Sequence, residues 1–192
     1  SVINQDAVEA LAEVDQTGNN NDSTITQDDE DAGGNESGTI NQDGDPEAIV
    51  VQNGNNNDSS ITQTILGQSF DIVGNVDQQG NGNSATVDQT LEAEDPQVNF
   101  MIRTDIDQAD GSTADVDQLV DGSNNGSLEA GVDSVSGDAT IDQSMSGSGN
   151  RRIDGRIFQN GTSIATIIQS MDGTGGADMD AVIDQDGNGN DA

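Results

Sequence analysis

Short stretches in which apolar and polar residues alternate recur along the whole chain of 192 residues. In NSATVDQ, residues 83–89, one face of an extended strand would carry the small, apolar or amide side chains Asn83, Ala85, Val87 and Gln89. The other face would carry serine, threonine and aspartate. Alternation with a period of two is typical of a β-strand with one buried face. The sequence therefore predicts strands with a small, β-branched and amide-bearing inner face.

These strands belong to a longer repeat. The frame Gln-x-Gly-x-x-Asn-x-(Ala or Ser)-x-(Ile or Val)-x-Gln is intact at residues 16–27, 52–63 and 78–89, and a fourth copy starts at Gln185. A shorter marker, (Ile or Val)-x-Gln, recurs between them, with the variant Val-Asp-Ser at residues 132–134. Alternate markers end at Gln5, Gln27, Gln52, Gln78, Gln108, Ser134, Gln159 and Gln185, so the successive steps are 22, 25, 26, 30, 26, 25 and 26. A nearly fixed period of this length indicates a repeat architecture.

The spacing predicts an all-β fold, a β-solenoid of parallel stacked rungs. Each rung would contain about 25 residues and two strands, and roughly seven and a half rungs would form a single domain over residues 1–192. Clusters of glycine and asparagine would form the corners, because both residues tolerate a positive φ. The longer arcs at residues 28–38 and 91–102 are predicted to be loops that bulge from one edge of the stack.

Composition changes the picture in two ways. Acidic residues number 37 against 4 basic ones, which gives a net charge of -33, and only 2% of residues are aromatic. Such a composition alone is typical of a disordered chain, but disorder gives no reason for Gln, Asn and Ala to stay in register. Stacked strands allow order without a large core, because each rung satisfies the backbone hydrogen bonds of the next. The charge argues against nucleic acid as a partner, since two polyanions repel each other.

The three intact frames resemble the curlin repeat of curli, the secreted amyloid fibres of bacterial biofilms. In that family, glutamine and asparagine side chains line the inside of a β-solenoid and stack as ladders. The resemblance implies ladder roles here for Gln16, Asn21, Gln27, Gln52, Asn57, Gln63, Gln78, Asn83, Gln89, Gln185 and Asn190. It also implies a secreted, extracellular structural subunit, in a biofilm matrix or in adhesion.

Aspartate precedes the marker residue at Asp15, Asp77, Asp88, Asp107, Asp117, Asp142 and Asp184. On stacked strands these side chains would form outward columns, in which unit charges about 4.8 Å apart repel by roughly 0.9 kcal/mol in bulk water. Such a column is either a solvated acidic face or a weak site for Ca²⁺, which favours carboxylate oxygens. No other cofactor is expected.

Three of the four basic residues lie together at Arg151, Arg152 and Arg156. They either form a docking patch for an acidic neighbour or neutralise aspartates of the same chain.

No catalytic function is expected, because the chain lacks the lysine, histidine, tryptophan and tyrosine that would position a sugar, and no carboxylate pair stands out. No stretch approaches the roughly 20 apolar residues of a membrane helix. The sequence favours a filament subunit that polymerises head to tail, with neighbouring filaments as a second candidate partner. The alternative is a monomeric solenoid that binds calcium or ice, although only short threonine patches such as STIT are present.

The two ends of the chain are complementary. QDGNGNDA, residues 185–192, is the first part of the frame, and SVINQ, residues 1–5, resembles the missing second part. The predicted junction between copies therefore comprises Val2, Ile3, Gln5, Gln185, Asn190 and Ala192.

Overall fold

The computed structural model of the chain describes residues 1–6, 11–17, 23–32, 47–67, 71–93, 100–109, 113–122, 126–134, 137–149, 151–174 and 177–187. These residues form two seven-stranded sheets. The odd sheet contains β1 (Val2–Asp6), β3 (Ser23–Ala32), β5 (Ser59–Gly67), β7 (Ser84–Ala93), β9 (Thr113–Gly122), β11 (Ala139–Ser148) and β13 (Ala165–Thr174). The even sheet contains β2 (Leu11–Thr17), β4 (Glu47–Asn53), β6 (Asp71–Gln79), β8 (Phe100–Gln108), β10 (Gly126–Ser134), β12 (Arg151–Asn160) and β14 (Ala177–Asp186).

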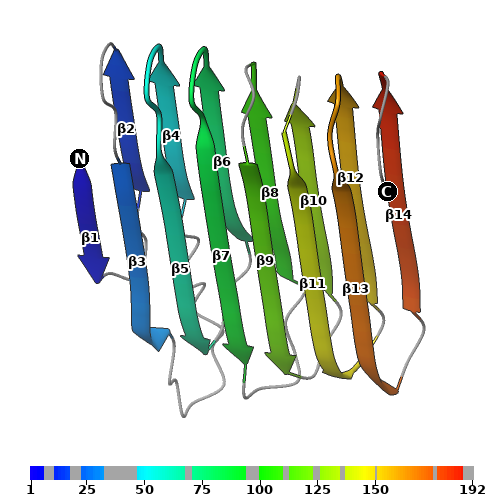
Figure 1. The fold of residues 1–192 in the computed structure, drawn as a ribbon. Helices are drawn as coiled ribbons and strands as arrows, with labels where there is room; N and C mark the ends of the chain where they lie inside the picture. The colour runs from blue at the N-terminus through cyan, green and yellow to red at the C-terminus, as the bar shows by residue number, and fades with distance from the viewer. Residues whose placement is uncertain are drawn as a thin grey trace.

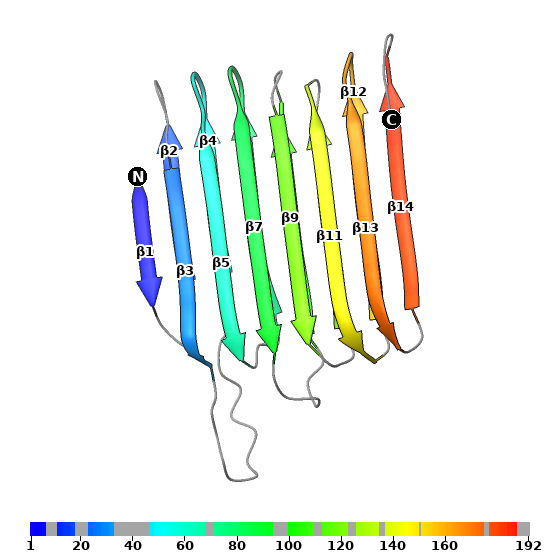
Figure 2. The ribbon, with the colours of Figure 1, turned by 60° about the horizontal axis from the view of Figure 1, so that its bottom comes forward.

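The strands alternate between the two sheets along the chain, so the chain winds as a flattened coil (Figures 1 and 2). Every strand pairs in parallel with the strand two places away in the sequence, as for β5 with β7 and β6 with β8. Parallel neighbours require a crossover, and here each crossover is a strand of the opposite sheet. The predicted parallel β-solenoid with two strands per rung is confirmed.

The regular part of the stack repeats about every 26 residues, as from Gln63 to Gln89 in the odd sheet and from Gln159 to Gln185 in the even sheet. In the even sheet, the paired marker positions are Gln52, Gln78, Gln108, Ser134, Gln159 and Gln185. The steps between these positions define about five regular turns. The predicted rung length is confirmed, and the number of regular turns is lower than predicted.

The register at the start of the chain differs from the prediction. Gln27 is paired with Gln63, and Gln16 is paired with Gln52, so each of these steps is longer than any later one. The predicted adjacency of Gln27 and Gln52 is therefore wrong. Residues 40–42 also match the (Ile or Val)-x-Gln marker and so predict a strand between these positions. Gln42 lies outside the described residues, and β4 of the even sheet directly follows β3 of the odd sheet.

The core between the sheets consists of aligned columns of small and β-branched residues. One cluster contains the isoleucine and valine of the markers together with alanines such as Ala85 and Ala114. A second cluster lies on the other side of the odd-sheet glutamines, because Leu91, Val120 and Met145 each follow one of them by two residues. It contains Ile72, Leu91, Ile102, Val120, Leu128, Met145 and Ile153. Leu91 and Ile102 are 1% and 0% exposed, so the prediction that residues 91–102 form a loop is wrong at both ends of that range.

Candidate functional site

The glutamines of the odd sheet form a continuous ladder inside the stack, called here the odd ladder. Each side-chain amide donates from Nε2 to the Oε1 of the glutamine one turn earlier. The bonds are Gln89 to Gln63 (2.8 Å), Gln118 to Gln89 (3.0 Å), Gln143 to Gln118 (2.9 Å) and Gln169 to Gln143 (3.1 Å). Gln63, Gln89, Gln118 and Gln143 are fully buried, so these four bonds satisfy polar groups that water does not reach.

The same amides also bond to the opposite sheet. The acceptors are main-chain oxygens at equivalent positions of successive even strands, in Val73, Arg103, Glu129, Asp154 and Asp180. Each glutamine therefore connects two rungs along the stack and the two sheets across it. A side chain with one carbonyl and one NH₂ group suits this position, because it accepts and donates at the same time.

Small residues of the even sheet make room for the odd ladder. A Cβ on Gly74 would lie 3.1 Å from Gln89 Nε2, and a Cβ on Gly155 would lie 3.0 Å from Gln143 Oε1. At the equivalent position of β8, the Thr104 hydroxyl donates to Gln89 Oε1 at 2.6 Å. The column opposite the odd ladder is thus occupied by glycine, by alanine such as Ala48 and Ala130, or by the threonine that joins its hydrogen bonding.

The corresponding column in the even sheet, the even ladder, is interrupted. Gln108 donates to Gln78 Oε1 at 3.0 Å and Gln185 donates to Gln159 Oε1 at 2.9 Å. Between these pairs stands Ser134, whose hydroxyl oxygen accepts from Gln159 at 3.3 Å. Gln52 Oε1 is buried and has no hydrogen-bond partner among the described residues. The predicted amide stacking is thus present on both sides of the core, but it is continuous only in the odd sheet.

Asparagines stack at one corner of two successive rungs. Asn83 Nδ2 donates to Asn57 Oδ1 at 3.0 Å, and both residues are buried. The corners before them have matching backbone conformations, with positive φ at Gly54 (97°) and Gly80 (75°) and at the asparagines that follow, Asn55 and Asn81. Asn55 Nδ2 donates to Asn81 Oδ1 at 2.8 Å outside the corner. Repetition of the frame at residues 52–63 and 78–89 therefore produces a repeated corner.

The other predicted ladder positions fall into two groups. Gln16 and Gln185 are half-buried on the first and last even strands. Gln27 lies in β3 in register with Gln63, but its side chain is outside the described set, as are Asn21 and Asn190. Five further ladder residues were missing from the predicted set, although the (Ile or Val)-x-Gln marker identifies them: Gln108, Gln118, Gln143, Gln159 and Gln169.

The predicted aspartate columns are shorter than expected. Asp88, Asp117 and Asp142 are adjacent on the odd sheet, where Thr62 and Ile168 end the column. On the even sheet, Asp77 and Asp107 continue to Asp133, and Phe158 separates this column from Asp184, whereas Val51 separates it from Asp15. Among the described residues, no group of three or more carboxylates is arranged to hold a metal ion.

The central aspartate of each column has a perturbed pKa. Partial burial, and then repulsion from Asp77, Asp133 and Asp105, raises the pKa of Asp107. Partial burial, and then repulsion from Asp88, Asp142 and Asp115, raises the pKa of Asp117. Both effects disfavour the charged form, so these columns are electrostatically strained at neutral pH.

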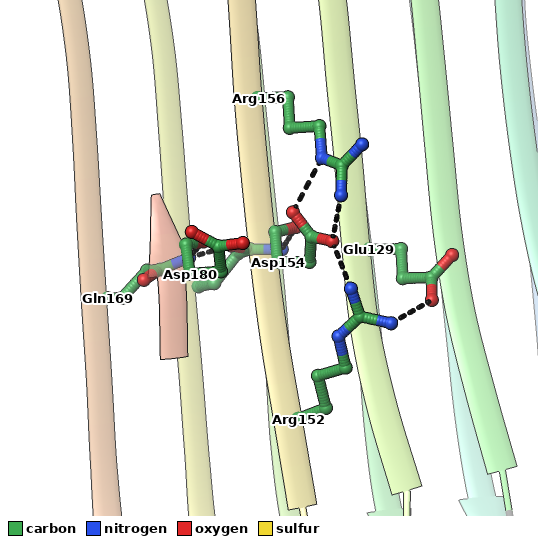
Figure 3. Close-up of polar contacts among 7 residues, drawn as sticks. Glu129, Arg152, Asp154, Arg156, Gln169 and Asp180 are labelled. Atoms are coloured by element: carbon green, nitrogen blue, oxygen red, sulfur yellow. Dashed lines mark hydrogen bonds and ion pairs between the residues drawn. The ribbon is translucent and has the colours of Figure 1, made fainter. Parts of the chain in front are cut away.

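Two of the clustered arginines neutralise an aspartate of their own strand (Figure 3). Asp154 Oδ2 accepts from Arg152 at 2.6 Å and from Arg156 at 2.8 Å, and Arg152 also lies 3.8 Å from Glu129. The pKa of Arg156 is raised, chiefly by its hydrogen bonds with Asp154. Arg103 lines the same hollow on the outer face of the even sheet, which has a volume of about 250 Å³. The side chain of Arg151 is outside the described set.

The first and last rungs differ from the inner rungs in what they expose. Among the described residues, eight large hydrophobic side chains are exposed, and six of them lie on these two rungs: Val2, Leu11, Ile164, Ile168, Met179 and Val182. Met179 occupies the same inner column as the fully buried Ile153, yet it is 53% exposed. Ile167, Gln169, Ile183 and Gln185 are likewise only half-buried. In the described residues, no strand covers the outer edge of β1, β2, β13 or β14.

Comparison with protein-family models, with curated proteins and with solved structures yields no match to this chain. Within the described ranges, no helix is long and apolar enough to span a membrane.

Proposed function

We propose that the protein is a structural subunit of an extracellular, curli-like filament in which copies stack head to tail, rung on rung. The observation that carries this proposal is the open core at both ends of the described stack. Strand edges expose rows of unpaired N–H and C=O groups and readily pair with another chain. Here those edges are accompanied by apolar core-column side chains that are not fully covered: Met179 is exposed, and Ile3, Ile167 and Ile183 are half-buried.

The two end rungs are chemically matched. If β1 of one copy extends the odd sheet beyond β13 of another, the columns place Ile3 on Ile167 and Gln5 on Gln169. In the even sheet, the same register places Ala12 on Ala181, Val14 on Ile183 and Gln16 on Gln185. Each pair continues a column of like residues, so an added copy would extend the ladders and the apolar columns together.

This contact joins different surfaces of the two copies. A heterologous contact that does not close a ring generates a filament. Of the predicted junction residues, Val2, Ile3, Gln5 and Gln185 lie on the two end rungs, whereas Asn190 and Ala192 are outside the described residues. The subunit acts through its contact surfaces and performs no catalysis. A net charge of -33 suits a saline extracellular medium that screens repulsion between copies.

Electron microscopy of the purified chain tests the proposal. We expect unbranched fibres whose diffraction shows a spacing of about 4.8 Å along the fibre axis. Substitution of Met179 by aspartate places a charge in the stacking surface and should slow elongation at least about tenfold, because burial of an unpaired charge is costly. Leu119→Asp is the matched control, because Leu119 is also exposed but lies on an inner strand of the odd sheet.

Two outcomes would count against the proposal. Equal elongation rates for the two variants would exclude stacking through the last rung. Monodisperse wild-type particles at high concentration would favour the alternative of a monomeric binding solenoid. The described surface gives that alternative less support, because the outer threonine column of the odd sheet is interrupted by Asp115, between Thr86 and Thr140.

A further inference from the structure

The hollow on the even sheet is exceptional in an acidic molecule. We call it the arginine hollow and define it by its charged lining: Arg103, Asp105, Glu129, Arg152, Asp154 and Arg156. Three arginines and three carboxylates give it a net charge of zero, so the whole net charge of -33 is carried elsewhere. An acidic partner therefore meets less repulsion at the hollow than at the aspartate columns.

The arginines of the hollow are more exposed than the aspartate that two of them neutralise. The side chain of Asp154 is only 7% exposed, whereas the Arg152 and Arg156 side chains that bond to it are 48% and 49% exposed. In Figure 3 these two arginines approach Asp154 from opposite directions along β12. Arg103 is exposed and has no ion-pair partner among the described residues. A guanidinium group carries five N–H donors, so the hollow retains donors for further carboxylates.

The opposite face of the molecule carries the complementary feature. Asp88, Asp117 and Asp142 occupy successive strands of the odd sheet, and their mutual repulsion would be relieved by a cation. Arg103 and the pair Arg152 and Arg156 lie on β8 and β12, two strands apart. Asp88 and Asp142 lie on β7 and β11, also two strands apart. With about 4.8 Å between strands, both sets repeat over about 10 Å along the stack.

We propose that the arginine hollow of one copy docks side by side against the Asp88–Asp117–Asp142 column of a second copy. The proposal rests on the proposed filament, to which it adds a lateral contact. Because the hollow and the column lie on opposite faces, the contact repeats from copy to copy and bundles parallel stacks. Many such contacts act together along two filaments, so contacts that are individually weak become sufficient.

Charge exchange tests the proposal, with filament width measured by electron microscopy near 0.15 M ionic strength. At this salt concentration, repulsion beyond about 8 Å is screened, whereas ion pairs in contact persist. Arg103→Glu and Asp88→Arg, at positions that the matched spacing places opposite each other, should each lower the fraction of bundled filaments about tenfold. Combined in one chain, the two changes leave the net charge at -33 and should restore bundling. Asp172→Arg, which makes the same charge change as Asp88→Arg outside the column, should not reduce bundling.

The outcomes separate the two proposals. If wild-type filaments form but remain single at all salt concentrations, or if the double variant bundles no better than the single variants, lateral docking is wrong and the filament stands. If no filaments form, the proposed function itself fails. If Arg103→Glu abolishes binding to a soluble polyuronate while wild-type filaments stay single, the occupant is an acidic polysaccharide and the second-copy proposal is overturned.

Discussion

The odd and even ladders extend along the same stack but are bonded differently. In the odd sheet, four amide-to-amide bonds follow one another from Gln63 to Gln169. In the even sheet only two such bonds are formed among the described residues, on either side of Ser134. Yet β10 pairs with β8 and β12 without any shift of register at Ser134. Strand stacking and side-chain ladders are therefore separable sources of order.

The second hydrogen bond of each amide sharpens the contrast. The odd ladder donates to main-chain oxygens of the opposite sheet, as from Gln118 to Glu129. The even ladder donates to oxygens at or beside the corners: Gln52 to Asp58, Gln78 to Ser84, Gln108 to Thr113, Gln159 to Gly137 and Gln185 to Ser163. The odd ladder thus connects the two sheets in the middle of the strands, and the even ladder connects them at the corners and at the first residues of the odd strands.

The largest expected effect comes from cutting the odd ladder at its centre. Gln118→Leu removes the acceptor of Gln143 and a donor to Gln89, and leaves buried polar groups on both sides. It should lower the free energy of unfolding by about 3 kcal/mol, measured by urea denaturation. Gln108→Leu in the even ladder breaks a single amide-to-amide bond and should cost about half as much.

Equal losses for these two variants would show that ladder continuity adds nothing beyond individual bonds. Far-UV circular dichroism should confirm that both variants keep their strands before the free energies of unfolding are compared.

A smaller loss of stability is expected when a methyl group is added beside the odd ladder. In Gly155→Ala, the new Cβ would lie 3.0 Å from Gln143 Oε1 and from Ile167 Cγ2, and Gln143 is fixed by its bonds. The variant should lose about 2 kcal/mol of stability in the same urea assay. Gly131→Ala on the outer face meets only Asp105 Oδ1, at 3.2 Å, and should be neutral or slightly stabilising. A neutral Gly155→Ala would mean that the ladder shifts freely.

Substitutions at Ser134, where the even ladder is interrupted, should change the free energy of unfolding by about 1 kcal/mol. Ser134→Gln puts an amide between Gln108 and Gln159 and should raise the unfolding free energy by about that amount. Ser134→Ala removes the acceptor of Gln159 and should lower the free energy by a similar amount. If the glutamine variant were instead destabilised, the gap at Ser134 would be too small for an amide and the two ladders could not be made alike.

The smallest effect concerns the outer faces, where the two sheets are alike. The pKa values of Asp107 and Asp117 are raised in the folded state from an ordinary value of 3.8, so the folded chain retains these protons to a higher pH. The resulting stabilisation is fully present below the unfolded pKa and is lost as pH rises through the folded pKa. Acidification from neutral pH towards about pH 4 should therefore increase the contribution of these two groups to stability.

Urea unfolding at neutral and mildly acidic pH measures this dependence. Asp107→Asn and Asp117→Asn should each raise stability at neutral pH and flatten the pH profile. A profile unchanged by both substitutions would show that solvent and salt already neutralise the columns.

The repeat frame was sufficient to predict the solenoid, the rung length and the inward glutamines, because alternation and spacing are local properties. It did not predict the register at Gln16 and Gln27, because the marker at Gln42 looks like a strand position although it adds no strand to the described sheets. The second apolar cluster was missed for a related reason. Leu91 and Ile102 stand beside acidic and proline-containing stretches that are typical of loops.

The division of the aspartate columns could not be predicted from sequence either. It depends on which strands become neighbours, and the columns end where Phe158, Ile168, Thr62 or Val51 fills the equivalent position. The pairing of Arg152 and Arg156 with Asp154 could have been anticipated, since residues two apart on a strand share a face.

The hydrogen bonds between rungs, in the backbone and in the ladders, are all directed along the stack. A tensile load on that axis is therefore shared by all the bonds of one layer, which must break together, whereas a pull on a corner peels one strand at a time. Such a stack is strong in tension and yields to peeling. In the part of the chain that the structure describes, the weakest layers of the even sheet are those without an amide-to-amide bond, beside Ser134 and between Gln52 and Gln78.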